Sequence, residues 1–365
     1  MSYSDQFENL AVFKEGSTIL PCDLSQTHLV DSSNSVVYTR QGRRNYQEDR
    51  TLCRLDLRIP FPGKTEAEEV RVGMVGVFDG HNGAEASEMA SKYILHYFLL
   101  HVWEFLRQEE FGEFIYNSLV NGTENHKEFK SSSPVTLERL IHMKILKESL
   151  SMAIQDIDKI FSEKARIHNI PAGSTAVVVL IVDNQLLVAN VGDSRAIVCS
   201  ETLKTPGDIK AAREKFYRQR RSQGDSAKKF KTGPNHFSVT ELTRDHHPDR
   251  DDERLRIESF GGFVEDSRVN GELALSRSIG DVTYKEYGVI STPEVTEWQL
   301  GANDTYLVVA SDGIFEQMTT KDVADVLWDA HDTCKGSSSL AECVVNSAFA
   351  SGSRDNLSAI VVPLK

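Results

Sequence analysis

Short apolar runs rich in β-branched residues recur along the chain, separated by turn residues. Runs of about 4–8 residues with this composition are typical of β-strands. Two successive runs are joined by the polar pair Asp183-Asn184, a hairpin signal that predicts antiparallel neighbours. The predicted strands are Val36–Thr39, Leu52–Leu57, Val72–Phe78, Thr175–Val182, Leu186–Val191, Ala196–Cys199, Val239–Leu242, Thr305–Ala310 and Ser358–Val362.

Two longer segments place their apolar residues at helical spacing instead. The stripes from Met89 to Phe105 and from Leu137 to Phe161 predict long amphipathic helices that face the core. Strands that follow one another in hairpins argue against the strand–helix alternation of Rossmann-type folds. We therefore expect an α+β fold, a β-sandwich of two antiparallel sheets flanked by helices in α/β/β/α layers. Shorter helices are predicted at Pro248–Phe260, Lys321–Ala330 and Leu340–Ala350.

The length of 365 residues allows two domains, but a layered α+β domain with surface insertions can reach this size as one unit. We expect one domain at 36–365, preceded by an N-terminal extension at 1–35 that is either an extra edge strand or a tail. Polar stretches near 107–135 and 204–231 are predicted to be insertions.

Composition and charge narrow the class of protein. With 40% hydrophobic and 26% charged residues the chain is typical of globular proteins, and its net charge of −13 argues against a general nucleic-acid-binding protein. Five scattered cysteines without a C-x-x-C pair predict neither a disulfide framework nor a zinc site, so a reducing compartment is expected. The sequence has no secretory signal and no apolar run long enough for a bilayer, so if Met1 is the true start we expect a location in the cytoplasm or nucleus, without membrane contact. We also expect a monomer.

The segment 204–231 is basic in an otherwise acidic chain. A solvated insertion and a docking patch for acidic or phosphorylated partners both fit this pattern. A nucleic-acid-binding surface is a third interpretation, which would predict a steep salt dependence and has little support from the overall charge. The basic residues are Arg213, Lys215, Arg218, Arg220, Arg221, Lys228, Lys229 and Lys231.

Four acidic turns share one relation to the predicted strands. Asp79, Asp193 and Asp312 each follow an apolar run, whereas Asp355 precedes one. Because the end of one antiparallel strand lies beside the start of its neighbour, all four fit on one rim. Carboxylates this close need raised pKa values or bound cations. Oxygen ligands without cysteine or several histidines favour Mg²⁺ or Mn²⁺ over zinc.

Further polar residues suit chemistry at such a rim. Two ions about 3.5–4 Å apart bridge a hydroxide and hold a phosphoryl group for in-line displacement. His81 is placed to protonate a leaving oxygen, and Arg44 has the forked cation that suits a phosphate dianion. Glu48 and Asp49 are candidates to hold metal-bound waters. Taken alone, each turn also fits an ordinary surface loop, but together they indicate a metal-assisted phosphoester hydrolase.

Eight ordered motifs between Val36 and Pro363 also carry a resemblance. The chain resembles the metal-dependent 2C-type (PPM) protein serine/threonine phosphatases, and its segment VFDGHNGAEASEMA is most similar to plant members. The resemblance implies a binuclear Mg²⁺ or Mn²⁺ site in a catalytic domain, and dephosphorylation of phosphoserine and phosphothreonine in protein substrates by direct attack of a metal-bridging hydroxide. The motifs are RRNYQEDR, VFDGHNG, AGSTAVV, VANVGDSRAIV, LTRDHHPD, NGELALSRSIGD, ASDGIFE and SRDNLSAIVV.

By the resemblance, Arg44 binds the phosphate and His81 is the general acid. Asp79 bridges both metals and the Gly80 carbonyl is a further ligand. The remaining roles belong to acidic residues: Asp312 and Asp355 complete one metal, Glu48 and Asp49 hold waters of the other, and Asp193, Asp312 and Glu316 form a weaker third site.

The sequence departs from the family pattern at Asn82, where a glycine is common, and at Glu316, where aspartate is usual. The resemblance also places the basic segment 204–231 at the variable flap beside the active site. A phosphatase-like binding protein without turnover is the alternative, and it predicts loss of a metal ligand. Asp79, Gly80, Asp312 and Asp355 are all present, which favours the active enzyme.

Overall fold

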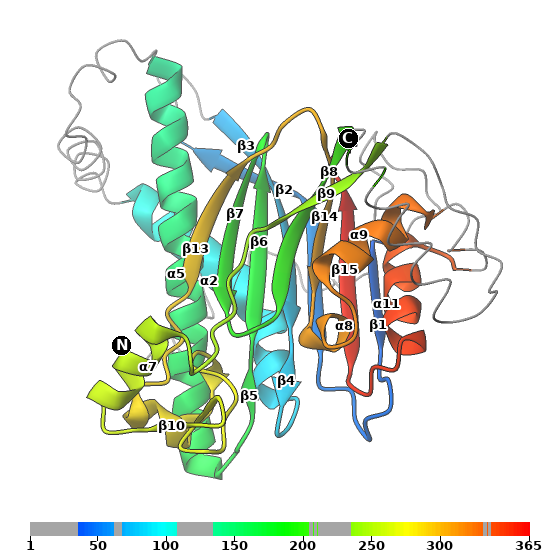
Figure 1. Ribbon diagram of the computed structural model, residues 1–365. Coiled ribbons are helices and arrows are strands. Elements are labelled where there is room, and N and C mark those ends of the chain that lie inside the picture. The colour runs from blue at the N-terminus through cyan, green and yellow to red at the C-terminus, as the bar shows by residue number, and fades with distance from the viewer. Residues whose placement is uncertain are drawn as a thin grey trace, which may run out of the picture.

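The computed structural model describes residues 36–61, 68–107, 134–203, 235–330 and 337–365, together with residues 207, 210 and 334. Two five-stranded antiparallel sheets stack against each other, and helices cover the outer face of each sheet (Figure 1). This arrangement confirms the expected α/β/β/α sandwich. The N-terminal extension at 1–35 and the predicted insertion near 107–135, apart from its first and last residues, lie outside the described residues.

The first sheet contains the central strand that the sequence predicts at Val72–Phe78. Its middle strands form a hairpin that turns at Asp183-Asn184, as expected. The edge strand β13 was not predicted, because its sequence EVTEWQ is charged and half-exposed rather than apolar. In spatial order the strands are β13 (Glu294–Gln299), β7 (Gln185–Val191), β6 (Ala176–Val182), β3 (Glu68–Phe78) and β2 (Arg50–Phe61).

The second sheet joins the two ends of the domain. Val37 of the first strand lies opposite Ile360 of the last, so the sheet closes only when the C-terminal segment is in place. In spatial order its strands are β1 (Val37–Arg40), β15 (Leu357–Pro363), β14 (Asp304–Ala310), β8 (Arg195–Leu203) and β9 (Asn235–Glu241).

Alternation along the strands divides the apolar side chains between the layers. Successive side chains of a strand point to opposite faces, so Met74 packs under the helices while Val75 packs between the sheets. Helices α2 (Glu85–Arg107) and α5 (Pro134–His168) cover the first sheet. Helices α9 (Thr320–Trp328) and α11 (Leu340–Ala350) cover the second. The predicted long stripes are therefore core-facing.

A small lobe follows β9 and has its own apolar cluster around Ile257 and Val289. The carboxylate of Glu253 is buried there. Although burial favours its protonated form, hydrogen bonds from Arg256 and Arg277 lower the pKa of Glu253. The lobe consists of α7 (Asp251–Ser259), β10 (Val264–Glu265), β11 (Arg268–Val269) and the 3₁₀ helix η3 (Val282–Tyr287). A separate three-stranded sheet contains, in spatial order, β12 (Ile279–Gly280), β5 (Gly173–Ser174) and β4 (Gly80–His81).

The basic segment 204–231 lies almost entirely outside the described residues, but its attachment points are defined. It leaves β8 at Leu203 and returns to β9 at Asn235, at the end of this hairpin remote from Asp193. At about 3.3 Å per residue, the nine-residue strand β8 separates these points from the acidic rim by roughly 30 Å. The attachment points are therefore remote from the rim, and the placement of the segment itself at a flap beside the active site stays a prediction, because it lies outside the described residues.

One cysteine pair corrects another expectation. Cys334 and Cys343 form a disulfide, with Cα atoms 5.2 Å apart, although no disulfide framework was predicted. The two cysteines are nine positions apart, and only the entry of the chain into α11 brings them together. Cys199 is free and buried under the second sheet's helices.

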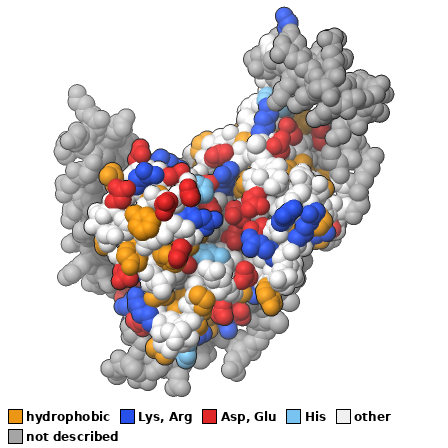
Figure 2. Space-filling model, turned by 60° about the horizontal axis from the view of Figure 1, so that its bottom comes forward, with side chains coloured by type: hydrophobic (Ala, Val, Ile, Leu, Met, Phe, Trp, Pro, Cys, Tyr) orange, Lys and Arg blue, Asp and Glu red, His pale blue; other side chains and the backbone are white. Residues whose placement is uncertain are grey.

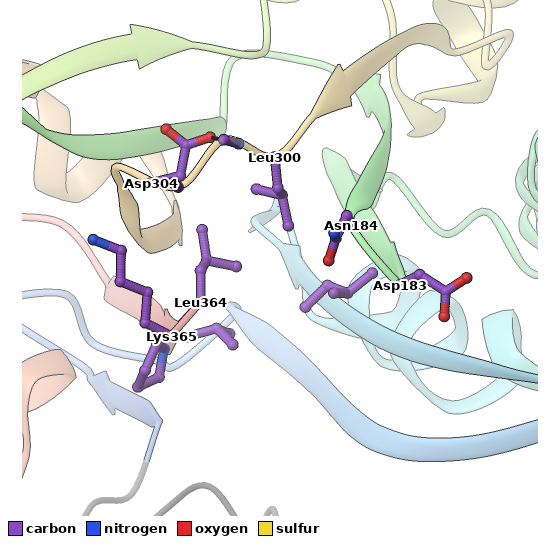
Figure 3. A pocket seen from close by; sticks show the side chains of 11 residues that line it. Asp183, Asn184, Leu300, Asp304, Leu364 and Lys365 are labelled. Carbon is purple, nitrogen blue, oxygen red and sulfur yellow. Dashed lines mark hydrogen bonds between the residues drawn. The ribbon is translucent and has the colours of Figure 1, made fainter.

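A cavity of about 410 Å³ lies at the C-terminal end of the sandwich, where Figure 3 shows Leu300 and Leu364 beside Asp183 and Asp304. The carboxylate of Asp304 is already engaged by Ser200, Trp298 and the Gly301 amide. The other acidic residue of its lining, Asp183, forms an ion pair with Arg139, so neither of these two carboxylates is unpaired. None of the helices in the described part of the chain has an apolar stretch long enough to cross a bilayer.

Candidate active site

The predicted acidic residues lie at one end of the sandwich. β3 and β7 end on the same side of the first sheet, and in the second sheet Ala310 at the end of β14 lies between Arg195 and Ala359. Figure 2 looks toward this end and shows acidic side chains gathered at the centre of the face, with basic side chains beside them. The antiparallel register thus brings the strand-end carboxylates together, as expected.

Asp79 is the single residue between β3 and the short strand β4 (Gly80–His81), which begins at Gly80. The Asp79 backbone exchanges hydrogen bonds with Thr175, which fixes the turn. A Cβ on Gly80 would lie 2.6 Å from the Glu48 carbonyl oxygen and 2.7 Å from Ser87 Oγ. Only glycine therefore lets the segment carrying Glu48 approach the metal-bridging candidate so closely.

The loop that carries Arg44 and Glu48 is tied to the C-terminal strand by Asn356. The Asn356 side chain donates to the carbonyls of Gln41 and Tyr46 and accepts from the Glu48 amide. Arg44, in turn, forms an ion pair with Asp355. Asn356 was not singled out from the sequence, although it lies within SRDN, because a buried amide that organises a loop has no periodic signal.

Asp49 is 3% exposed, and one of its carboxylate oxygens is a buried hydrogen-bond acceptor without a donor. Its Oδ2 accepts a hydrogen bond from Ser311 at 2.9 Å, while its Oδ1 is buried without a partner. An orphaned carboxylate oxygen is costly in a protein interior unless a cation or water satisfies it. This observation fits a bound divalent cation or one of its waters at the rim.

The electrostatics of the rim point the same way. Burial and the charges of Asp49 and Asp312 raise the pKa of Asp79 well above its ordinary value. Burial raises the pKa of Asp49 to about 6, and burial with the charge of Asp312 raises the pKa of Asp193 to about 7. These carboxylates repel one another in the bare protein, so they would gain stability from cations.

Within the described part of the chain, the carboxylates of Asp312, Glu316 and Asp355 form a group whose ligand oxygens lie within 4.8 Å of one another. Asp312 begins the short helix α8 (Asp312–Phe315), and Glu316 directly follows its last residue. A third-site grouping of Glu316 with Asp193 remains a prediction, because Glu316 lies with Asp355 here. Oxygen-only donors of this kind suit Mg²⁺ or Mn²⁺.

His81 has a partner that the sequence did not reveal. Its Nε2 lies 2.8 Å from Oδ2 of Asp281, which is 2% exposed. Burial opposes the charged imidazole, but the hydrogen bond and charge of Asp281 outweigh it and raise the pKa of His81. A Cβ on Gly173 would lie 2.3 Å from this carboxylate and 2.4 Å from Nε2, so glycine leaves room for the pair. The motif SRSIGD was the available signal for Asp281.

The chain is similar to a known protein family over most of its length. Residues 34–206 and 221–357 match the family Protein phosphatase 2C. The chain belongs to this family. It is 46% identical over 370 residues to "Probable protein phosphatase 2C 51" of Arabidopsis thaliana, covering 89% of this chain and 70% of the relative. It is 47% identical to "Putative protein phosphatase 2C 76" of Oryza sativa subsp. japonica, covering 89% of this chain and 72% of the relative.

Animal relatives and solved structures agree with the family. This protein phosphatase 2C chain is 31% identical to the "Integrin-linked kinase-associated serine/threonine phosphatase 2C" of Mus musculus, over 89% of this chain and 71% of the relative. The solved serine-threonine phosphatase 2C from Toxoplasma gondii shares the fold, with a TM-score of 0.62 and 21% identity over 90% of this chain and 94% of that chain. The family indicated by the motifs is confirmed. The similarity to plant members is also confirmed, since the relatives at 46% and 47% identity are plant proteins.

Proposed function

We propose that this protein phosphatase 2C hydrolyses phosphoserine and phosphothreonine residues of proteins with Mg²⁺ or Mn²⁺ as its cofactor. The observation that carries the proposal is the buried Asp49 oxygen without a partner, on a rim shared with Asp79 and Asp312. Such a rim is electrostatically incomplete without cations, and the exposed guanidinium of Arg44 lies at its edge. The family membership supports the same activity.

Each residue of the rim then has a distinct role. Asp79, the Gly80 carbonyl, Asp312 and Asp355 would hold two ions, with Glu48 and Asp49 binding their waters. A third, weaker ion would involve Asp193, Asp312 and Glu316. When bound, these ions supply an activated water and offset charge on the phosphoryl group.

Arg44 and His81 would handle the substrate. The side chain of Arg44 is 58% exposed, so its fork can reach a phosphate dianion while its other face contacts Asp355. His81, held by Asp281 with a raised pKa, keeps the proton that a serine or threonine alkoxide needs as the P–O bond breaks. Neither role requires a covalent phosphoenzyme.

Phosphate release from a phosphothreonine peptide tests the proposal. We expect turnover with added Mn²⁺, none after EDTA treatment, and recovery when excess Mn²⁺ is restored. A protein that binds the peptide but releases no phosphate under any metal condition would instead be a phosphatase-like binding protein. The same assay on the matching phosphotyrosine peptide tests the serine/threonine preference, which would be refuted by equal rates.

A further inference from the structure

A cavity of about 460 Å³ beside the acidic rim is lined by three arginines, of which the proposed reaction gives a role to one. It is lined by Arg43, Arg44, Glu316, Arg354 and Asp355. Arg44 has its role at the phosphate, and the two acidic residues belong to the metal group. Arg43 and Arg354 therefore remain as exposed cations at the mouth of the site, in a chain whose net charge is −13.

Neither of these arginines is paired within the described part of the chain. Arg44 contacts Asp355, but no ion pair or hydrogen bond engages Arg43 or Arg354 there. The guanidinium of Arg43 lies 5.6 Å from the Phe349 ring centroid, whereas Arg40 occupies the closer position at 3.6 Å and donates to Asn346. The Phe349 ring can thus orient Arg43 without neutralising it.

Two distant segments place these arginines at one point. Arg43 precedes Arg44, and Arg354 precedes Asp355, so the Arg44–Asp355 contact anchors both segments at the rim. An extended peptide advances about 3.3 Å per residue. With its phosphate at Arg44, the side chains two or three positions away would lie over the same cavity.

The chemistry of the pair suits an anion. Guanidinium groups bind carboxylates and phosphates through two parallel hydrogen bonds, and an exposed guanidinium sacrifices little hydration to do so. The neighbouring acidic residues of the cavity do not satisfy Arg43 or Arg354, and bound cations would offset the charge of Asp355 and Glu316 further. An incoming negative side chain would find both arginines available.

We infer that Arg43 and Arg354 form a second anion subsite, which recognises a negatively charged side chain close to the target residue. The inference rests on the proposed function and specifies its substrates as acidic or multiply phosphorylated segments. A carboxylate and a second phosphate share the required chemistry. Peptides that carry one or the other distinguish these two sources.

The test compares kcat/KM on a phosphothreonine peptide with neutral flanks and on versions with glutamate at each position within three residues of the target. A parallel set carries a non-hydrolysable phosphonate instead of glutamate. We expect at least one flanking position to raise kcat/KM about tenfold, mainly through KM, and the gain to shrink with salt.

The quantity compared between variants is the ratio of kcat/KM on the charged peptide to kcat/KM on the neutral peptide. In the Arg43→Gln/Arg354→Gln variant this ratio should fall to about one, and Arg43→Lys should keep part of it. Exposed Arg58→Gln on β2, whose side chain is 64% exposed, is the matched control and should keep it fully.

The outcomes separate this inference from the proposed function. Hydrolysis of the neutral peptide with no gain from any flanking charge would overturn the subsite and leave the phosphatase intact. A gain that persists in the double variant would also overturn it. Absence of hydrolysis on every peptide would instead contradict the proposed function. The melting temperatures of the Arg43→Gln/Arg354→Gln and Arg43→Lys variants show whether they are folded. The single Arg43→Gln variant, measured on the same charged and neutral peptides, gives a second check with less disturbance of the fold.

Discussion

His81 and Asp281 are joined across 200 positions of the sequence, with 2.8 Å between Nε2 and Oδ2. His81 lies on β4, and Asp281 lies between β12 and the start of η3; β4 and β12 both pair with β5 in the three-stranded sheet. Asp281 therefore holds the imidazole in one orientation and favours its protonated form. This gives the lobe a direct connection to the proposed proton donor.

Replacing Asp281 by asparagine should weaken catalysis most at alkaline pH. Loss of the negative charge removes what keeps the pKa of His81 raised, and burial then favours the neutral ring. We expect the alkaline limb of kcat for a phosphopeptide to move to lower pH, with a loss of about tenfold or more at pH near 8. Asp266→Asn is the control, since Asp266 shares the left-handed backbone but is exposed in the lobe. An unchanged pH profile in Asp281→Asn would show that the contact does not tune the acid.

Replacing His81 itself should separate substrates by their leaving groups. Serine and threonine alkoxides need a proton as they leave, whereas nitrophenolate does not. His81→Ala should therefore lose about 10²–10⁴-fold on a phosphopeptide but much less on nitrophenyl phosphate, with metal saturating. The remote His236→Ala on β9 should affect neither substrate. Equal losses on both substrates would assign His81 a structural or water-orienting role.

The bare carboxylate rim should make stability depend on pH. A carboxyl group whose pKa is higher in the folded than in the unfolded state costs stability as pH rises from the unfolded value of about 4 through the folded value. Burial raises the pKa of Asp49 to about 6 and of Asp193 to about 7, so the metal-free protein should lose stability between about pH 4 and 7. Thermal melts after EDTA treatment measure this trend.

Metal binding should oppose this loss. Because ligands bind as deprotonated carboxylates, the Mn²⁺-induced rise in Tm should be larger near pH 7.5 than near pH 5.5. Asp193→Asn should raise the Tm of the metal-free protein near pH 7.5, by removing one of the repelling charges. Asp183→Asn, in the exposed turn of the remote hairpin, should not. A metal effect on Tm independent of pH would contradict a carboxylate site.

Glu316 should tune metal affinity rather than perform chemistry. Its carboxylate lies with those of Asp312 and Asp355, and aspartate at this position would be one methylene shorter. Glu316→Asp should therefore shift the metal concentration needed for half-maximal activity. The expected shift is at least several-fold and no more than about 100-fold, the range seen for changes around metal ligands. Glu297→Asp on the edge strand β13 is the matched control. Superimposable titrations would exclude Glu316 as a ligand.

Local patterns predicted the sandwich because its strands are apolar and its turns polar. The ends of β3, β7 and β14 identified Asp79, Asp193 and Asp312, since a carboxylate directly after a buried strand stands out. Antiparallel pairing then predicted their shared rim. These inferences needed only the periodicity of the side chains and the direction of the strands. Neighbouring residues determine the first, and hairpin turns indicate the second.

Long-range contacts escaped the same reasoning. Asp281 has a left-handed backbone with φ of 49° and follows no long strand, so nothing local connects it to His81. The small lobe was predicted only as one helix, because its cluster around Ile257 forms from short segments. The charge of the basic insertion drew attention to it, but charge gives no information on where a loop is attached.

Metal binding and turnover measured on one sample test the central claim most directly. After EDTA treatment, Mn²⁺ is titrated by equilibrium dialysis while phosphate release from a phosphothreonine peptide is followed. We predict about two tightly bound ions per chain, activity that rises in parallel with them, and loss of both in Asp79→Ala and Asp312→Ala. The folded state of each variant is checked by its Tm, and Asp183→Asn should match the unmodified protein. Full turnover in EDTA, or in Asp79→Ala without bound Mn²⁺, would contradict the account.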